Sequence, residues 1–163
     1  MLLEFSSSIM CLILAGKVGS NIASELGTMR VTQQIDALDI MGVNSAGYLI
    51  MPKILGLMTL MPCLVIFADV MGVIGAYATA YIGHILSPED LTLGLQHAFN
   101  PWFVWMSIIK STVCAFIIAS VSSFCGYTVE GGSVEVGKAS TSAVVNSSIL
   151  ILFSDVFLTQ LLS

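Results

Sequence analysis

Charge is the scarcest property of this chain of 163 residues. Only 9% of its residues are charged, whereas a soluble domain carries about 25%. Hydrophobic residues make up 56% of the chain, and its mean hydropathy is +0.97. The net charge is −5 and no basic patch occurs, which argues against a nucleic-acid partner. We therefore expect an all-α polytopic membrane protein.

The chain also lacks the short motifs of common catalytic and binding sites. Its cysteines, Cys11, Cys63, Cys114 and Cys125, stand singly in apolar runs, where buried small hydrophobes are the usual interpretation. No CxxC or Cys/His cluster supports a metal site. No GxxxxGK[ST] motif occurs, so we do not expect the chain itself to bind ATP through a P-loop. Neither an enzyme nor a cofactor is expected.

Long apolar runs indicate the membrane topology. We expect complete spans at residues 52–84, 102–127 and 139–162, because each approaches or exceeds the ~20 residues that a helix needs to cross a bilayer. Residues 1–23 are expected to form only part of a preceding span. Pro52 suits the first turn of its helix. Lys110, inside the second run, is expected to extend outward to the interface, with a headgroup phosphate contact as the alternative.

The runs are separated by three more polar stretches. We expect residues 24–51 and 128–138 on one side of the membrane, and a loop with a short helix at residues 85–101 on the other. Within the first stretch, Val31, Ile35, Leu38 and Met41 recur at helical spacing. They predict an amphipathic helix over residues 24–41, presented to a soluble partner.

Small residues four positions apart predict faces where helices approach closely in lipid. These faces comprise Gly72, Ala76 and Ala80; Gly16, Ser20 and Ser24; Gly19, Ala23 and Gly27; and Ala139, Ala143 and Ser147.

Asp69 is an acid within a predicted span, where such residues usually face the bundle interior. It predicts either a structural hydrogen bond or a cavity contact, and less readily a proton relay.

The basic residues favour one orientation. Lys17, Arg30, Lys53 and Lys138 lie in or beside the stretches 24–51 and 128–138, and residues 84–101 contain no Lys or Arg. By the positive-inside rule, these two stretches are expected in the cytoplasm and the C-terminus on the outer, periplasmic face.

Two motifs carry a family resemblance, ELGTMRVTQQIDALDIMGVNSAGYLIMPK and GYTVEGGSVEVGKASTSAVVNSS. Both resemble the MlaE family, permease subunits of bacterial ABC transporters that move phospholipid between membranes. Gln33 stands where the family usually has glutamate, and Ser142 where arginine or glutamine is common. The resemblance implies one MlaE-type permease domain over residues 1–163 in a bacterial inner membrane. Because members carry a longer N-terminal part, it also implies an N-terminally truncated chain.

The resemblance also implies partners. These are a separate ABC ATPase subunit, a periplasmic MCE-domain substrate-binding protein, a second permease copy, and phospholipid as cargo. Glu4 matches a glutamate that lies near the lipid cavity in the family, and a structural hydrogen bond inside the bundle is the alternative for it. Glu4 and Asp69 are the cavity candidates. We expect the contact with the ATPase to comprise Glu25, Arg30, Val31, Gln33, Gln34, Ile35, Asp36 and Leu38.

Two alternative functions come from other classes. Half of a secondary transporter could use Asp69 and Glu4 for ion coupling, but such a protein is typically built from broken helices or inverted repeats, and no internal repeat is seen. The other alternative is an incomplete or non-transporting membrane scaffold.

Overall fold

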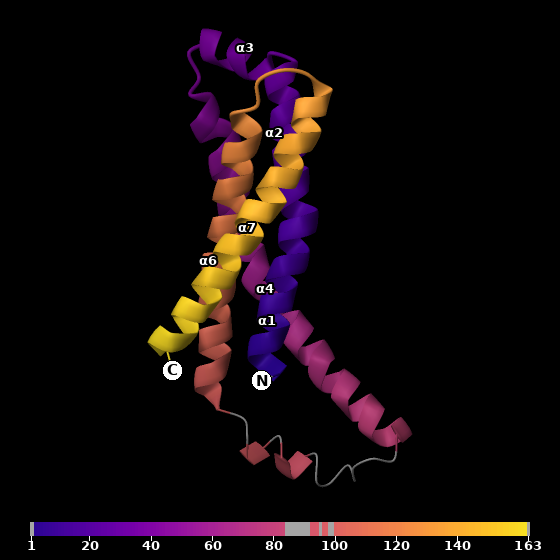
Figure 1. Ribbon diagram of the computed structural model, residues 1–163. Helices are drawn as coiled ribbons and strands as arrows, with labels where there is room; N and C mark the ends of the chain where they lie inside the picture. Colours follow the sequence, from indigo (N-terminus) through magenta and orange to yellow (C-terminus); the bar gives the residue numbers. More distant parts are fainter. Residues whose placement is uncertain (1, 84–91, 95, 98–99, 163) are drawn as a thin grey trace.

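The computed structural model describes residues 2–83, 92–94, 96–97 and 100–162. Long helices run side by side in Figure 1, and the short helix α3 lies across one end of the bundle. The described residues include four helices long and apolar enough to cross a membrane, at 6–31, 45–83, 101–127 and 133–161. The all-α, polytopic fold class is therefore confirmed. We call the end of the bundle that carries α3 the α3 end.

The first candidate span is a nearly continuous rod. It contains α1 (Leu2–Leu14), a π-helical turn η1 (Ala15–Gly19) and α2 (Ser20–Val31). The rod continues past residue 23, where the sequence predicted the end of a partial span. Leu26 and Gly27 are buried, so α2 keeps its packing contacts beyond that boundary. The stretch 6–31 has 26 residues, enough by length to cross a bilayer.

A single amphipathic helix over residues 24–41 was predicted, and this prediction is wrong. The helix α2 ends at Val31, and Gln33 has a φ of 59°, a left-handed conformation that non-glycine residues rarely adopt. The chain then forms α3 (Gln34–Ile40). This turn folds α3 back onto the bundle, where Ile35 is completely buried.

The helix α4 (Ser45–Gly83) begins earlier than predicted. Its first turn is capped by Asn44, whose Oδ1 accepts a hydrogen bond from the Gly47 N–H at 3.2 Å, as N-cap residues do. Pro52 is therefore inside the helix together with Pro62, and its predicted place in the first turn is wrong. The later part of α4 leaves the bundle in Figure 1.

The last two long helices are α6 (Pro101–Tyr127) and α7 (Ser133–Leu162). Asn100 caps α6 by accepting a hydrogen bond from the Trp102 N–H at 3.2 Å. Pro101 occupies the first turn, so the helix begins one residue before the predicted span. The predicted loop at 128–138 is too long, because α7 already starts at Ser133. Much of the loop with a short helix predicted at residues 85–101 lies outside the described residues, while 92–94 and 96–97 are helical.

The helix α6 forms the centre of the bundle, packing against α1, α2, α4 and α7. Small residues allow α6 and α2 to approach each other closely. A Cβ added at Gly126 would lie 2.7 Å from the Ala23 carbonyl oxygen and 2.9 Å from Leu26 Cβ. The buried apolar core comprises Cys11, Ala15, Met61, Cys114, Ala115, Ile118 and Ile151.

Candidate functional site

The α3 end is held together by a polar cluster centred on Arg30. Its guanidinium donates a hydrogen bond to Asp36 Oδ1 at 2.8 Å, which ties α2 to α3 across the Gln33 turn. The same guanidinium lies over the Tyr127 ring, 5.8 Å from its centroid. The Tyr127 hydroxyl is 2.9 Å from the hydroxyl oxygen of the buried Ser45. Residues of α2, α3, α4 and α6 thus meet at one point.

A second ion pair joins α2 to α4 close to this cluster. Lys53 Nζ lies 2.6 Å from Glu25 Oε2, and the Lys53 side chain is 21% exposed. Three residues of the predicted contact, Glu25, Arg30 and Asp36, therefore have partners within the chain. Because both pairs link separate helices, displacement of α3 would act on α2 directly and on α4 and α6 through it.

The remaining predicted contact residues differ in exposure. Gln33 and Gln34 are exposed, and Val31 and Leu38 are half-buried. Ile35 is completely buried, so it stabilises the position of α3 and is not on the surface that a partner would meet.

The contact predicted from the sequence left out the two most exposed apolar side chains of the α3 end. Ile40 and Met41 are 88% and 74% exposed, and they stand at the C-terminal end of α3. Their signal in the sequence was two adjacent apolar residues directly before the turn glycine, Gly42, whose φ is +78°.

Buried charges form a second polar region, far from α3 along the bundle. The side chain of Lys110 is only 3% exposed, and its Nζ lies 3.3 Å from Asp155 Oδ1. Lys110 also donates a hydrogen bond to Thr159 at 2.7 Å, and Ser8 donates one to Asp155 at 2.7 Å. The prediction that Lys110 extends outward is wrong, because its counter-ion on α7 keeps the ammonium inside the bundle.

The cavity candidates are only partly described. Asp69 Oδ2 accepts a hydrogen bond from Ser107 at 3.4 Å, so the predicted structural hydrogen bond is present. Glu4 lies in α1, but its side chain is outside the described part of the structure. The role of both residues in a lipid cavity stays a prediction. Among the described residues, no group of three or more His, Cys, Asp or Glu side chains could hold a metal ion.

The predicted small-residue face of α4 is open within the chain. A Cβ added at Gly72 would meet nothing within 4 Å. Ala76 is half-buried, and Ala80 is buried at the far end of the face. Close packing at Gly72 is therefore absent among the described residues.

The chain is similar to known permeases along nearly its whole length. The family Permease MlaE matches residues 1–161. A probable ABC transporter permease protein of Rickettsia bellii is 45% identical over 151 residues, which are 92% of this chain and 58% of that protein. A probable ABC transporter permease protein of Synechocystis is 32% identical over 98% of this chain and 60% of that protein.

A plant protein is also similar. The chloroplast protein TRIGALACTOSYLDIACYLGLYCEROL 1 of Arabidopsis thaliana is 33% identical over 96% of this chain and 45% of that protein. The chain thus spans about six tenths of the length of the two bacterial relatives and less than half of the plant one. With a family match that covers residues 1–161, this chain belongs to the MlaE permease family.

Proposed function

We propose that this chain is the permease subunit of an ABC-type transporter that moves phospholipid or a related lipid, powered by a separate ATPase subunit. The observation that carries the proposal is the exposed helix α3, which crosses the end of a bundle of candidate spans and is fixed there by the Arg30–Asp36 pair. A short helix in this position can be displaced by a soluble partner and can transmit that displacement to the bundle. The probable ABC transporter permeases among the relatives support an ATPase partner.

The contact with the ATPase involves the outer side of α3. Gln33 and Gln34 are exposed there, and Ile40 and Met41 add apolar area of the kind found at the centre of protein interfaces. Movement of α3 is transmitted through Arg30 to Tyr127 on α6 and from there to Ser45 on α4. Coupling requires that ATP-bound and ATP-free states favour different packings of these helices.

The lipid and the other partners are also part of the proposal. The name of the plant relative contains a galactolipid, which supports a glycerolipid as cargo. Glu4 and Asp69 are proposed to contact it. A second permease copy is proposed on the open face of α4, an MCE-domain protein on the periplasmic side, and the bacterial inner membrane as the location. The basic residues favour a cytoplasmic α3 end and a periplasmic C-terminus.

The test uses the chain assembled with its ATPase and its MCE-domain partner. Asp36→Lys and Asp39→Lys change the net charge equally and both alter exposed carboxylates on α3, but only Asp36 pairs with Arg30. We expect Asp36→Lys to abolish transfer of a fluorescent phospholipid between vesicles while ATP hydrolysis continues. Asp39→Lys should retain transfer.

A charge swap makes this test sharper. The double variant Arg30→Asp/Asp36→Arg should restore the pair and most of the transfer, because the pair and not either charge alone holds α3. Unchanged transfer by Asp36→Lys would contradict the coupling role of α3. Transfer that depends on a proton gradient and not on ATP would contradict the proposed function itself.

A further inference from the structure

The first candidate span contains one irregular turn, η1 (Ala15–Gly19), between the α-helices α1 and α2. Its backbone hydrogen bonds are of the π type, which reach one residue farther along the chain than those of an α-helix. Single π-turns inside α-helices are frequent at functional sites, and they are one of the few causes of a sharp bend in a helix. We therefore expect the rod of α1, η1 and α2 in Figure 1 to bend most readily at η1.

Two glycines in η1 have different surroundings. A Cβ added at Gly19 would lie 2.9 Å from the hydroxyl oxygen of Ser122 on α6, whereas one added at Gly16 would meet nothing within 4 Å. Gly19 therefore allows α6 to approach the turn closely, and packing does not require a glycine at position 16. Because glycine lowers the stability of a helix, its presence at position 16 favours a turn that changes its shape.

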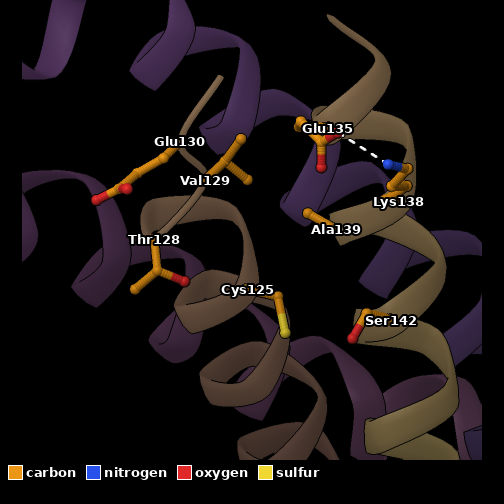
Figure 2. A pocket seen from close by; sticks show the side chains of 8 residues that line it. All are labelled: Cys125, Thr128, Val129, Glu130, Glu135, Lys138, Ala139 and Ser142. Carbon is orange, nitrogen blue, oxygen red and sulfur yellow. Dashed lines mark hydrogen bonds and ion pairs between the residues drawn. The ribbon is translucent and has the colours of Figure 1, made fainter. Parts of the chain in front are cut away.

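Hydroxyl groups fix the C-terminal side of η1. The Ser20 hydroxyl donates a hydrogen bond to the Lys17 carbonyl oxygen at 3.2 Å. The Ser140 hydroxyl of α7 donates one to the Ser20 carbonyl oxygen at 3.1 Å. The helix α7 lies beside α6 here, and Figure 2 shows Ser142 of α7 across from Cys125 of α6. The two helices thus form a common frame around this part of the first span.

The Ser122 hydroxyl faces η1 but has no hydrogen-bond partner among the described residues. Ser122 is completely buried, and a buried hydroxyl without a partner lowers stability. Other serines of α6 avoid this cost by donating to a carbonyl oxygen of their own helix, as Ser111 and Ser120 do at 2.8 and 3.2 Å. Ser122 is therefore placed to donate to a carbonyl oxygen of η1 when the turn changes its shape.

The two helices on either side of η1 lead to opposite ends of the bundle. The helix α2 is tied to α3 by the Arg30–Asp36 pair. The helix α1 carries Glu4 and Ser8, which donates a hydrogen bond to Asp155 at 2.7 Å. Along the first span, a displacement of α2 therefore reaches the far end of the bundle only through η1.

We propose that η1 is the hinge at which a displacement of α2 becomes a movement of α1, and that the Ser122 hydroxyl stabilises the displaced state by donating a hydrogen bond to a carbonyl oxygen of η1. The structure shows the state in which this hydrogen bond is not formed. The hinge rests on the proposed function, because movement of α3 driven by ATP is what displaces α2. It adds the point where the span bends and the residue that selects between the two states.

Two neighbouring serines of α6 provide a matched test. Ser122 and Ser123 are both buried, and the hydroxyl of each lacks a partner among the described residues. Only Ser122 faces η1, since Ser123 lies one helical turn before Tyr127, on the side that meets α4. In the complex with the ATPase and the MCE-domain protein, Ser122→Ala should reduce ATP-dependent phospholipid transfer about fivefold, the effect of one hydrogen bond. Ser123→Ala should leave transfer unchanged.

The labelling rate of Cys11 reports the hinge without measuring transfer. Cys11 lies on α1 and is 1% exposed, so it reacts with a lipid-soluble maleimide only when α1 moves away from the core. The other cysteines are replaced, Cys114 by alanine and both Cys63 and Cys125 by serine. We expect ATP turnover to accelerate the labelling of Cys11. Ser122→Ala should reduce this acceleration without lowering thermal stability, because its hydroxyl has no partner in the state shown.

A second pair of variants tests the flexibility of the turn itself. Gly16→Ala and Gly56→Ala each add a Cβ that meets nothing within 4 Å, the first in η1 and the second inside α4. Because alanine has less backbone freedom than glycine, Gly16→Ala should reduce transfer by up to about fivefold. Gly56→Ala makes the same chemical change away from the hinge and should retain transfer.

Two results would overturn the hinge. One is equal transfer within either matched pair of variants. The other is an equal rate of Cys11 labelling with and without ATP. In both cases the unmodified complex still transfers phospholipid when ATP is present, so the proposed function stands. Failure of the unmodified complex to transfer phospholipid would contradict the proposed function, and the hinge would then fall with it.

Discussion

The centre of the bundle, around α6, and the later part of α4, which carries Gly72, Ala76 and Ala80, both contain small residues. The centre is closely packed, whereas most of α4 is exposed. In the most apolar stretch of α6, 44% of the residues are buried, against 11% in α4. Gly126 on α6 leaves no room for even one added carbon beside Ala23, whereas Gly72 on α4 faces open space. The same small-residue pattern therefore marks a finished contact in one helix and an unoccupied face in the other.

The difference follows from what stabilises helices in lipid. Lipid tails are as apolar as leucine, so close backbone approach and polar contacts drive association there. The centre has both, because small residues at the α3 end are followed along α6 by the Lys110–Asp155 pair. The later part of α4 has small residues alone. This contrast supports the proposal that a second copy covers this face of α4.

The largest effect is expected from breaking the buried ion pair at the centre. Lys110→Met leaves Asp155 without its counter-ion, and removal of one partner of a buried pair costs about 3–5 kcal/mol. The double variant Lys110→Met/Asp155→Leu removes both charges and should recover most of the stability. The measurement is the temperature at which Cys11 and Cys114, both buried, become reactive to a thiol probe in detergent.

That measurement needs a background without fast-reacting thiols. Cys63 is exposed and Cys125 is half-buried, so both are replaced by serine in every variant compared. If the single and double variants lose equal stability, the pair is not the cause, and the central packing depends on shape alone.

A smaller loss is expected at the close contact between α2 and α6. Gly126→Ala adds a Cβ that would sit 2.7 Å from the Ala23 carbonyl oxygen, so α2 and α6 must move apart, and overpacking of this kind costs about 1–3 kcal/mol. The thiol-reactivity temperature should fall, while far-UV circular dichroism stays helical. An unchanged temperature would show that α2 can move away without loss.

Sequence patterns located the spans but not their ends. The apolar runs predicted each long helix, because a helix in lipid needs an unbroken apolar stretch. The ends depend on local capping: Asn44 starts α4 ahead of Pro52, and α7 begins at Ser133 inside a predicted loop. The turn at Gln33 contains no glycine or proline that would have predicted it. The turn follows from the burial of Ile35 against the bundle.

Among the polar sites, too, some contacts were predictable from the sequence and others were not. The Arg30–Asp36 contact could not be predicted from the sequence, because residues six positions apart lie on different sides of the single helix that was expected there. The turn at Gln33 brings them together. Lys110 and Asp155 are each the only charged residue of a predicted span, and spans joined by a short loop run antiparallel. Pairing them by depth would have predicted their contact. Considering each span by itself led instead to the wrong prediction that Lys110 extends to the membrane interface.

The smallest effect on stability is expected at the open face of α4, and it is the most direct test of the difference between α4 and α6. Gly72→Ala has space for its Cβ and replaces a poor helix former, so the chain should gain up to about 1 kcal/mol. The opposite signs at Gly72 and Gly126 would show that the two faces differ by occupancy and not by composition.

A bulkier change on the same face tests what covers it. Ala76→Leu should leave the thiol-reactivity temperature of the single chain within about 0.5 kcal/mol, as for substitutions away from packed features. It should weaken self-association, because a leucine prevents the close backbone approach that small-residue interfaces require. Energy transfer between labelled copies in liposomes measures this association, with Leu60→Ala, an exposed residue of the same helix, as the control. Equal association of both variants would assign the open face of α4 to lipid alone, and the second permease copy would then have to bind elsewhere on the bundle.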